Sequence, residues 1–153
     1  MNPEILFAVC NYGVLPAWLL LVVLPHNPWT HRFIHAGWIP LLLASVYVTM
    51  LLSGPGTPEG ASFASLEGVM LFFTVPQATL AGWVHYLVFD LFVGAWQVRD
   101  ARRHGIRHLY VVPCLFFTLM FGPIGLSLYL LLRLALRRRA ALDEQLDPPE
   151  AVR

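Results

Sequence analysis

One apolar stretch of this chain is long enough to cross a lipid bilayer and carries a carboxyl group near its middle. It extends from Gly82 to Asp100, where several arginines follow. Roughly 20 helical residues, each rising about 1.5 Å, match a hydrocarbon core about 30 Å thick. The stretch therefore predicts a membrane span with Asp90 near its centre. Because a charge at that depth costs about 3 kcal/mol or more, Asp90 is expected to face protein or water and is a candidate for function.

The helical repeat of 100° per residue sorts the notable side chains of this span onto two stripes. One stripe carries Trp83, Tyr86, Asp90 and Gly94, and the other carries His85 and Trp96. Tyr86 and Asp90 are four residues apart and therefore within hydrogen-bonding reach of each other. His85 and Asp90 point roughly 140° apart, so a direct pair between them would require a distorted helix.

The composition is that of an integral membrane protein. Hydrophobic residues make up 58% of the 153 residues and charged residues only 12%, whereas soluble domains are about a quarter charged. The basic residues are all arginines near span ends, and the net charge is +1, so nucleic acid is not an expected partner. Cys10 and Cys114 lie in apolar runs without metal-site spacing, which predicts buried thiols.

We predict an all-α, four-helix transmembrane bundle over residues 1–139, formed by one domain. Its spans are expected near residues 4–24, 33–52, 77–98 and 109–135. A short amphipathic helix around residues 66–73 is too short to span, so we place it at the membrane interface between the second and third spans. We expect Asn11 to bond to a neighbouring helix. Residues 140–153 are acidic and contain proline, which predicts a polar, flexible tail.

The predicted fourth span contains the sequence Phe121-Gly-Pro-Ile-Gly125 at its centre. Glycine and proline loosen helical hydrogen bonding there, which predicts a break facing the bundle interior. We assign a substrate pocket to Gly122 and Pro123 together with Trp83, Gly94 and Trp96. Close packing through Gly122 and Gly125, with no part in chemistry, stays an equal alternative. We favour one broken span over a re-entrant helix because each half has only about 13 residues. Both termini then lie on one side, and the arginines divide between the two sides too evenly to set the orientation.

Three histidines near the second span raise the question of a metal site. His31 and His35 are four residues apart, and His26 lies just upstream. Membrane di-iron enzymes need several such histidine boxes, and one box supplies too few ligands. We therefore expect no metal or other cofactor, although whether these histidines do more than anchor the interface stays open.

The segments Gly82–Trp96 and Phe121–Tyr129, separated by an arginine-rich loop and Pro113-Cys114, resemble a known family. From about residue 69 to residue 133 the chain is similar to the abscisic-acid-deficient (neoxanthin synthase-like) family of multi-pass membrane proteins. That family includes plastid proteins required to make neoxanthin from violaxanthin, as well as bacterial members without an assigned role. The resemblance implies a carotenoid or other isoprenoid ligand in the bilayer, but a family does not by itself define a substrate.

The lysine-free, arginine-rich composition is compatible with a bacterial protein. The first span starts at once, so we expect no plastid transit segment and place the protein in the bacterial inner membrane. The sequence does not indicate an oligomeric state.

Two functions from different classes stay open. The first is a cofactor-independent isomerase that opens an epoxide of a carotenoid or other isoprenoid. A buried carboxyl group favours its neutral form, so Asp90 would be the acid, with Tyr86 orienting it and His85 on a second face of the cavity. The second is a non-catalytic protein that binds or scaffolds carotenoid, lipid or partner proteins, in which Asp90 and Tyr86 form a polar clamp. A proton-coupled transporter has less support, because the chain has one central carboxylate and no internal repeat.

Overall fold

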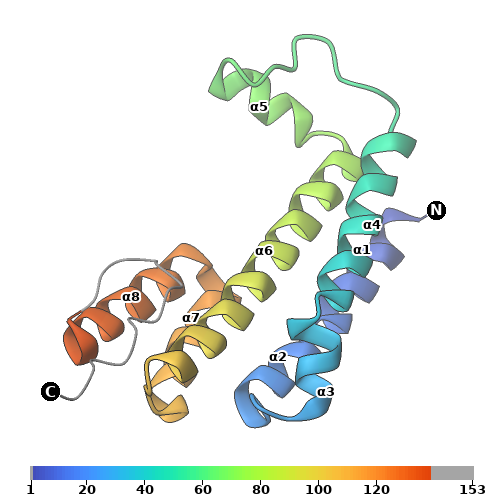
Figure 1. The fold of residues 1–153 in the computed structure, drawn as a ribbon. Helices are drawn as coiled ribbons and strands as arrows, with labels where there is room; N and C mark the ends of the chain where they lie inside the picture. Colours follow the sequence, from blue (N-terminus) through green and yellow to red (C-terminus); the bar gives the residue numbers. More distant parts are fainter. Residues whose placement is uncertain (1, 139–153) are drawn as a thin grey trace, which may run out of the picture. The chain divides into compact units, whose positions relative to one another are not determined.

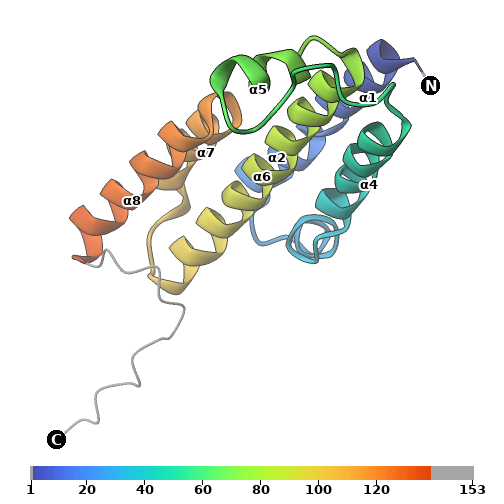
Figure 2. The same cartoon turned by 90° about the horizontal axis from the view of Figure 1, so that it is seen from above.

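The structure is a computed structural model that describes residues 2–138, whose regular elements are all helices, with no strand among them (Figures 1 and 2). The elements are α1 (Pro3–Gly13), α2 (Leu15–Val23), α3 (Pro28–Thr30), the π-helix η1 (His31–His35), α4 (Trp38–Ser53), α5 (Leu66–Phe72), α6 (Pro76–Arg103), α7 (His108–Phe121) and α8 (Pro123–Arg137). The chain divides into two compact units, residues 1–95 and residues 96–153. The tail expected at 140–153 lies outside the described residues.

Three helical segments within residues 2–138 are long and apolar enough to cross a membrane, as judged by length and composition. They are Pro3–Val23, Pro28–Ser53 and Pro76–Arg103. Many of their large apolar side chains are exposed, including Leu19, Leu42 and Phe89. Outward-facing apolar side chains are what a lipid environment accommodates, so the helices support a membrane protein.

The local sequence explains where the helices of the first unit start and stop. Asn2 caps α1 by accepting a hydrogen bond from the Glu4 backbone N–H at 2.9 Å, and Pro3 occupies the first turn, where its missing N–H costs nothing. Gly37 has a φ of 83° and separates η1 from α4, a conformation that glycine adopts readily. The short helix expected around residues 66–73 is present as α5, capped by Ser65.

The second unit is a helical hairpin. In both views α7 and α8 lie side by side (Figures 1 and 2), and Gly122 turns the chain between them with φ 41° and ψ −88°. Gly125 packs so closely on Thr118 that a Cβ atom would collide with the Thr118 backbone. At the open end, Arg137 donates a hydrogen bond to the Gly105 carbonyl at 2.6 Å.

This hairpin corrects the single fourth span expected at 109–135. A continuous helix of that length would separate its ends by about 40 Å, whereas the bond between Arg137 and Gly105 joins residues from the two ends. Gly122 adopts a positive φ without steric cost, which lets α8 fold back onto α7. A buried hydrogen bond also holds α7 against the end of α6. The Gln97 side-chain amide donates it to the Thr118 hydroxyl at 2.9 Å.

Candidate functional site

The candidate site centres on Asp90 in helix α6. Its side chain is buried, with 8% of the residue exposed. The Tyr86 hydroxyl, one turn earlier on the same helix, hydrogen-bonds to the Asp90 carboxyl group, as the four-residue spacing predicted. The second carboxyl oxygen, Oδ2, is buried and has no hydrogen-bond partner among residues 2–138.

An unsatisfied oxygen at this position is energetically unfavourable. A buried polar atom without a partner costs about 1–3 kcal/mol. Such exceptions are few in folded proteins, and each one calls for an explanation such as a catalytic role or a bound group. Asp90 Oδ2 therefore has an unused hydrogen-bonding position, as an acceptor or, when protonated, as a donor.

His85 does not join Asp90 and Tyr86. Its ring lies against Phe89, with centroids 4.5 Å apart, and against Tyr47 of α4, with centroids 5.8 Å apart. The helical repeat already placed His85 on a different stripe of α6 from Asp90. Of the three residues predicted to be catalytic, the structure brings together Tyr86 and Asp90.

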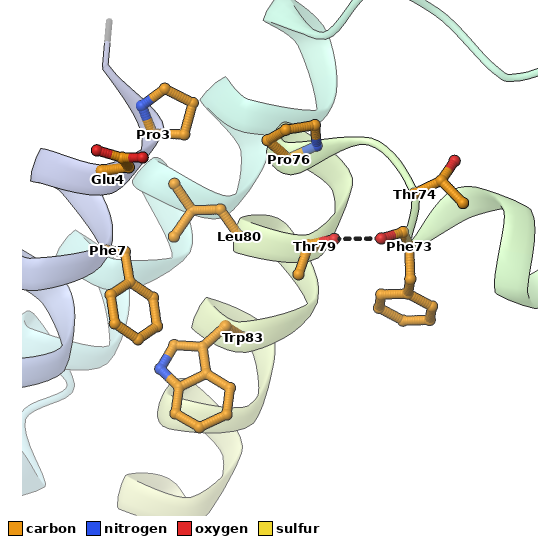
Figure 3. A pocket seen from close by; sticks show the side chains of 9 residues that line it. All are labelled: Pro3, Glu4, Phe7, Phe73, Thr74, Pro76, Thr79, Leu80 and Trp83. Atoms are coloured by element: carbon orange, nitrogen blue, oxygen red, sulfur yellow. Dashed lines mark hydrogen bonds between the residues drawn. The ribbon is translucent and has the colours of Figure 1, made fainter.

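A cavity of about 460 Å³ lies between the start of α1 and the start of α6 (Figure 3). Its lining is mainly apolar and consists of Pro3, Glu4, Phe7, Phe73, Thr74, Pro76, Thr79, Leu80 and Trp83. The hydroxyl of Thr79 is already used, because it donates to the Phe73 carbonyl at 2.7 Å. The charged group of the lining is the Glu4 carboxylate. We call this cavity the α1–α6 groove.

Trp83 connects the α1–α6 groove to the residues around Asp90. Its ring lies 5.7 Å from the ring of Phe7 and 5.5 Å from the ring of Tyr86, between centroids. Its indole N–H donates to the Asn11 side chain at 3.1 Å, which confirms the expected bond from Asn11 to a neighbouring helix. A single aromatic stripe on α6 therefore runs from the groove towards Asp90.

The other predicted pocket residues lie elsewhere. Gly94 is buried within α6. Trp96 packs edge-on against Tyr129 of α8, with ring centroids 5.4 Å apart. Gly122 and Pro123 form the turn between α7 and α8. Of the five predicted pocket residues, Trp83 is the one that lines the α1–α6 groove.

A second buried carboxylate, Asp100, belongs to a cluster that the sequence analysis missed. Arg133 Nη1 lies 3.0 Å from both carboxylate oxygens of Asp100, and the Tyr129 hydroxyl donates to Oδ2 at 2.6 Å. His104 Nδ1 lies 3.9 Å from Oδ1. Arg133 and Tyr129 are fully buried. Since both oxygens of Asp100 are satisfied, this cluster stabilises the packing of α8 on the end of α6.

The sequence contains a pattern that indicates a buried arginine in this cluster, but the pattern does not identify the acidic partner. Tyr129 and Arg133 are four residues apart and share one face of α8. An arginine on the inward face of an otherwise apolar helix implies a buried acidic partner. Sequence alone does not show that Asp100, 33 residues earlier, is that partner, because only the reversal at Gly122 brings the two together.

The described residues contain no group of three or more histidine, cysteine, aspartate or glutamate side chains arranged to hold a metal ion. His31 and His35 contact each other edge-on, with ring centroids 6.2 Å apart. Cys10 and Cys114 are both buried and free, which confirms the prediction of buried thiols.

Comparison with known proteins supports a single family. The model of the ABA DEFICIENT 4-like family matches residues 5–129. One relative is Protein ABA DEFICIENT 4, chloroplastic, of Arabidopsis thaliana, which is 27% identical over 128 residues. No solved structure matches the chain.

The match covers 78% of this chain and 56% of the plant protein, so the chain spans about half the length of this relative. Because the relative is chloroplastic, the comparison gives no support to the bacterial inner membrane expected from composition. The family model covers most of the chain and confirms the resemblance seen in the two motif-bearing segments. The chain belongs to the ABA DEFICIENT 4-like family.

Proposed function

We propose that this protein is a membrane-embedded isomerase that opens an epoxide of a carotenoid or related isoprenoid, with Asp90 as the proton donor. One observation carries the proposal: a carboxyl oxygen of Asp90 is buried in a candidate span without a partner, while Tyr86 holds the same group. Intramembrane carboxyl groups are rare and usually functional. The family resemblance supplies the substrate class.

The proposed reaction needs one proton donor and one proton acceptor. Asp90 transfers its proton to the epoxide oxygen as a carbon–oxygen bond breaks, and the oxygen becomes a hydroxyl group. A neighbouring carbon–hydrogen bond then loses its proton, and its electron pair forms a new carbon–carbon double bond. Substrate and product have the same formula, so no oxidant or reductant is consumed.

We assign both proton transfers to Asp90. After donating its proton the group is a carboxylate beside the substrate, and accepting the carbon-bound proton returns it to its starting state. The Tyr86 hydroxyl stabilises the intermediate carboxylate and fixes its orientation. Since His85 packs on Tyr47 and Phe89, this scheme assigns it no proton.

The α1–α6 groove supports a long apolar substrate. Trp83 lines the groove and lies seven residues before Asp90, which is about 10 Å along a helix. A ligand that fills the groove and reaches Asp90 along α6 must be extended and largely apolar. Aromatic walls such as Trp83 and Phe7 suit the flat face of a polyene.

The test compares Asp90→Asn with the wild-type protein in membranes supplied with epoxy- and hydroxy-carotenoids. The amide keeps the size of the side chain and removes the acid, so product formation is expected to fall roughly 10²-fold or more at equal protein level. Glu67→Gln removes an exposed carboxyl group from α5 and is the matched control. Wild-type turnover in the Asp90→Asn variant would refute the proposal.

The alternative is a non-catalytic protein that binds carotenoid or lipid, and the α1–α6 groove favours it independently of Asp90. Co-purification of carotenoid with wild-type protein that forms no product would support this alternative. Leu80→Trp fills the groove from a buried position, so under either function the pigment that co-purifies is expected to fall.

A further inference from the structure

The start of α7 and the end of α8 lie close together, beside the end of α6. The Asp100 carboxylate, near the end of α6, binds Arg133, near the end of α8. The Gly105 carbonyl, just before α7, accepts a hydrogen bond from Arg137 at 2.6 Å. Two independent contacts therefore hold the C-terminal end of α8 beside the loop that leads into α7.

Neither helix of the hairpin crosses a bilayer alone. α7 has 14 residues and α8 has 15, which corresponds to about 21–23 Å at about 1.5 Å per residue, against a hydrocarbon core about 30 Å thick. Exposed apolar side chains such as Phe116, Phe121 and Leu128 line the hairpin up to its tip. This is the composition of a re-entrant element whose backbone bonds are satisfied internally.

We propose that the α7–α8 hairpin enters and leaves the bilayer on the side where α6 ends, and that the arginines gathered there bind the headgroups of anionic phospholipids.

The charge of this end is strongly basic. Residues 96–138 contain one acidic residue, Asp100, which already has Arg133 as its partner. The arginines of the same segment are Arg99, Arg102, Arg103, Arg107, Arg133, Arg137 and Arg138. Four of them, Arg102, Arg107, Arg137 and Arg138, are exposed, and Arg137 already donates to the Gly105 carbonyl. We call Arg102, Arg107 and Arg138 the arginine cluster, and anionic headgroups are the partner that complements it.

The charged residues of the first unit also divide unequally between the two sides of the membrane when the spans are counted along the chain. With three spans, Arg32 follows the first span and falls on the same side as the end of α6. Glu4, Glu59 and Glu67 fall on the opposite side. An excess of arginine marks the cytoplasmic side of membrane proteins. With three spans and a re-entrant hairpin, the orientation is defined and the two ends of residues 2–138 lie on opposite sides, which differs from both sequence predictions.

The lipid arm of the test compares phosphatidylglycerol with phosphatidylcholine bound to the purified full chain, counted by native mass spectrometry. Each arginine near an anionic surface contributes about a fivefold preference. The triple variant Arg102→Gln, Arg107→Gln, Arg138→Gln is expected to lower the preference for phosphatidylglycerol at least about fivefold. The control Glu59→Gln, Glu67→Gln removes two exposed charges from the other side, away from the α1–α6 groove, and is expected to leave the preference unchanged.

Two results of the lipid arm would overturn the proposal. One is an equal preference in the wild-type protein and the arginine triple variant. The other concerns residues 140–153, whose acidic side chains are the competing occupant of the arginine cluster. If the full chain shows no preference and deletion of 140–153 creates one, the tail and not lipid occupies this surface.

The topology arm uses single cysteines in a background without Cys10 and Cys114. Thr57→Cys lies in the loop between α4 and α5, whereas Leu109→Cys and Leu136→Cys lie at the two ends of the hairpin, and all three positions are exposed. A membrane-impermeant maleimide is expected to label Leu109→Cys and Leu136→Cys from one side and Thr57→Cys from the other. Labelling in detergent establishes that each thiol reacts. Labelling of Leu136→Cys from the Thr57→Cys side would overturn the re-entrant hairpin.

Discussion

Replacing Arg133 with methionine tests how the hairpin is held to α6. Arg133 is fully buried, and its partner Asp100 is 2% exposed. Arg133→Met keeps much of the side-chain volume but leaves the Asp100 carboxylate buried without its counter-ion. Tyr129 still donates one hydrogen bond to that carboxylate at 2.6 Å.

The geometry sets the size of the effect. Opposite unit charges 3.0 Å apart attract by about 5 kcal/mol at an effective dielectric constant near 20. Breaking a buried ion pair by removing one partner costs about 3–5 kcal/mol. Because the Tyr129 bond to Asp100 remains, we expect Arg133→Met to lower the free energy of unfolding by about 3 kcal/mol.

Asp100→Asn alone leaves the Arg133 guanidinium buried without a carboxylate, and a loss of about 3 kcal/mol is again expected. The double variant Asp100→Asn, Arg133→Met removes both charges, and the asparagine still accepts the Tyr129 hydrogen bond. Its stability is therefore expected within about 1 kcal/mol of the wild-type protein, far from the sum of the single losses.

The assay is reversible unfolding in mixed detergent micelles with increasing dodecyl sulfate, followed by circular dichroism and extrapolated linearly. Arg138→Met removes an exposed arginine from the same helix end and is expected to change stability by less than about 0.5 kcal/mol. A loss below about 1 kcal/mol for Arg133→Met, or additive losses in the double variant, would refute the assignment of Asp100 and Arg133 as a buried pair.

Two further predictions use the same protein. Gly125→Ala places a Cβ atom against the Thr118 backbone and is expected to cost about 3 kcal/mol in the unfolding assay; Gly13→Ala, with no atom within 4 Å of the new Cβ, is the control, and equal stability of the two variants would contradict the close packing. His85→Phe keeps an aromatic ring against Tyr47, so the turnover of epoxy-carotenoid is expected to fall far less than the roughly 10²-fold typical of a lost acid or base; a loss of that size would give His85 a catalytic part.

The parts of the structure that depend on local pattern were predictable from the sequence. Apolar length identified the segments that match Pro3–Val23, Pro28–Ser53 and Pro76–Arg103. The four-residue spacing predicted the bond between Tyr86 and Asp90, and the same helical repeat separated His85 from them. These predictions succeed because each rests on the geometry of one regular helix.

The hairpin was not predictable in the same way. A glycine and a proline within an apolar run are compatible with a kink, a straight break or a full reversal. What decides between them is long-range: the contact of Gly125 with Thr118, and the pairing of Asp100 with Arg133. A buried arginine 33 residues from its partner leaves no periodic pattern in the sequence.

Asp90 and Asp100 lie ten residues apart on α6 and differ in how their carboxyl groups are hydrogen-bonded. Both carboxyl groups are buried. Asp100 has an arginine and a tyrosine on its two oxygens, so the cost of burying its charge is offset. Asp90 has one tyrosine and an oxygen without a partner among the described residues. A folded chain gains nothing from leaving that oxygen unpaired, and this difference is what supports the role proposed for Asp90, whereas packing is sufficient for Asp100.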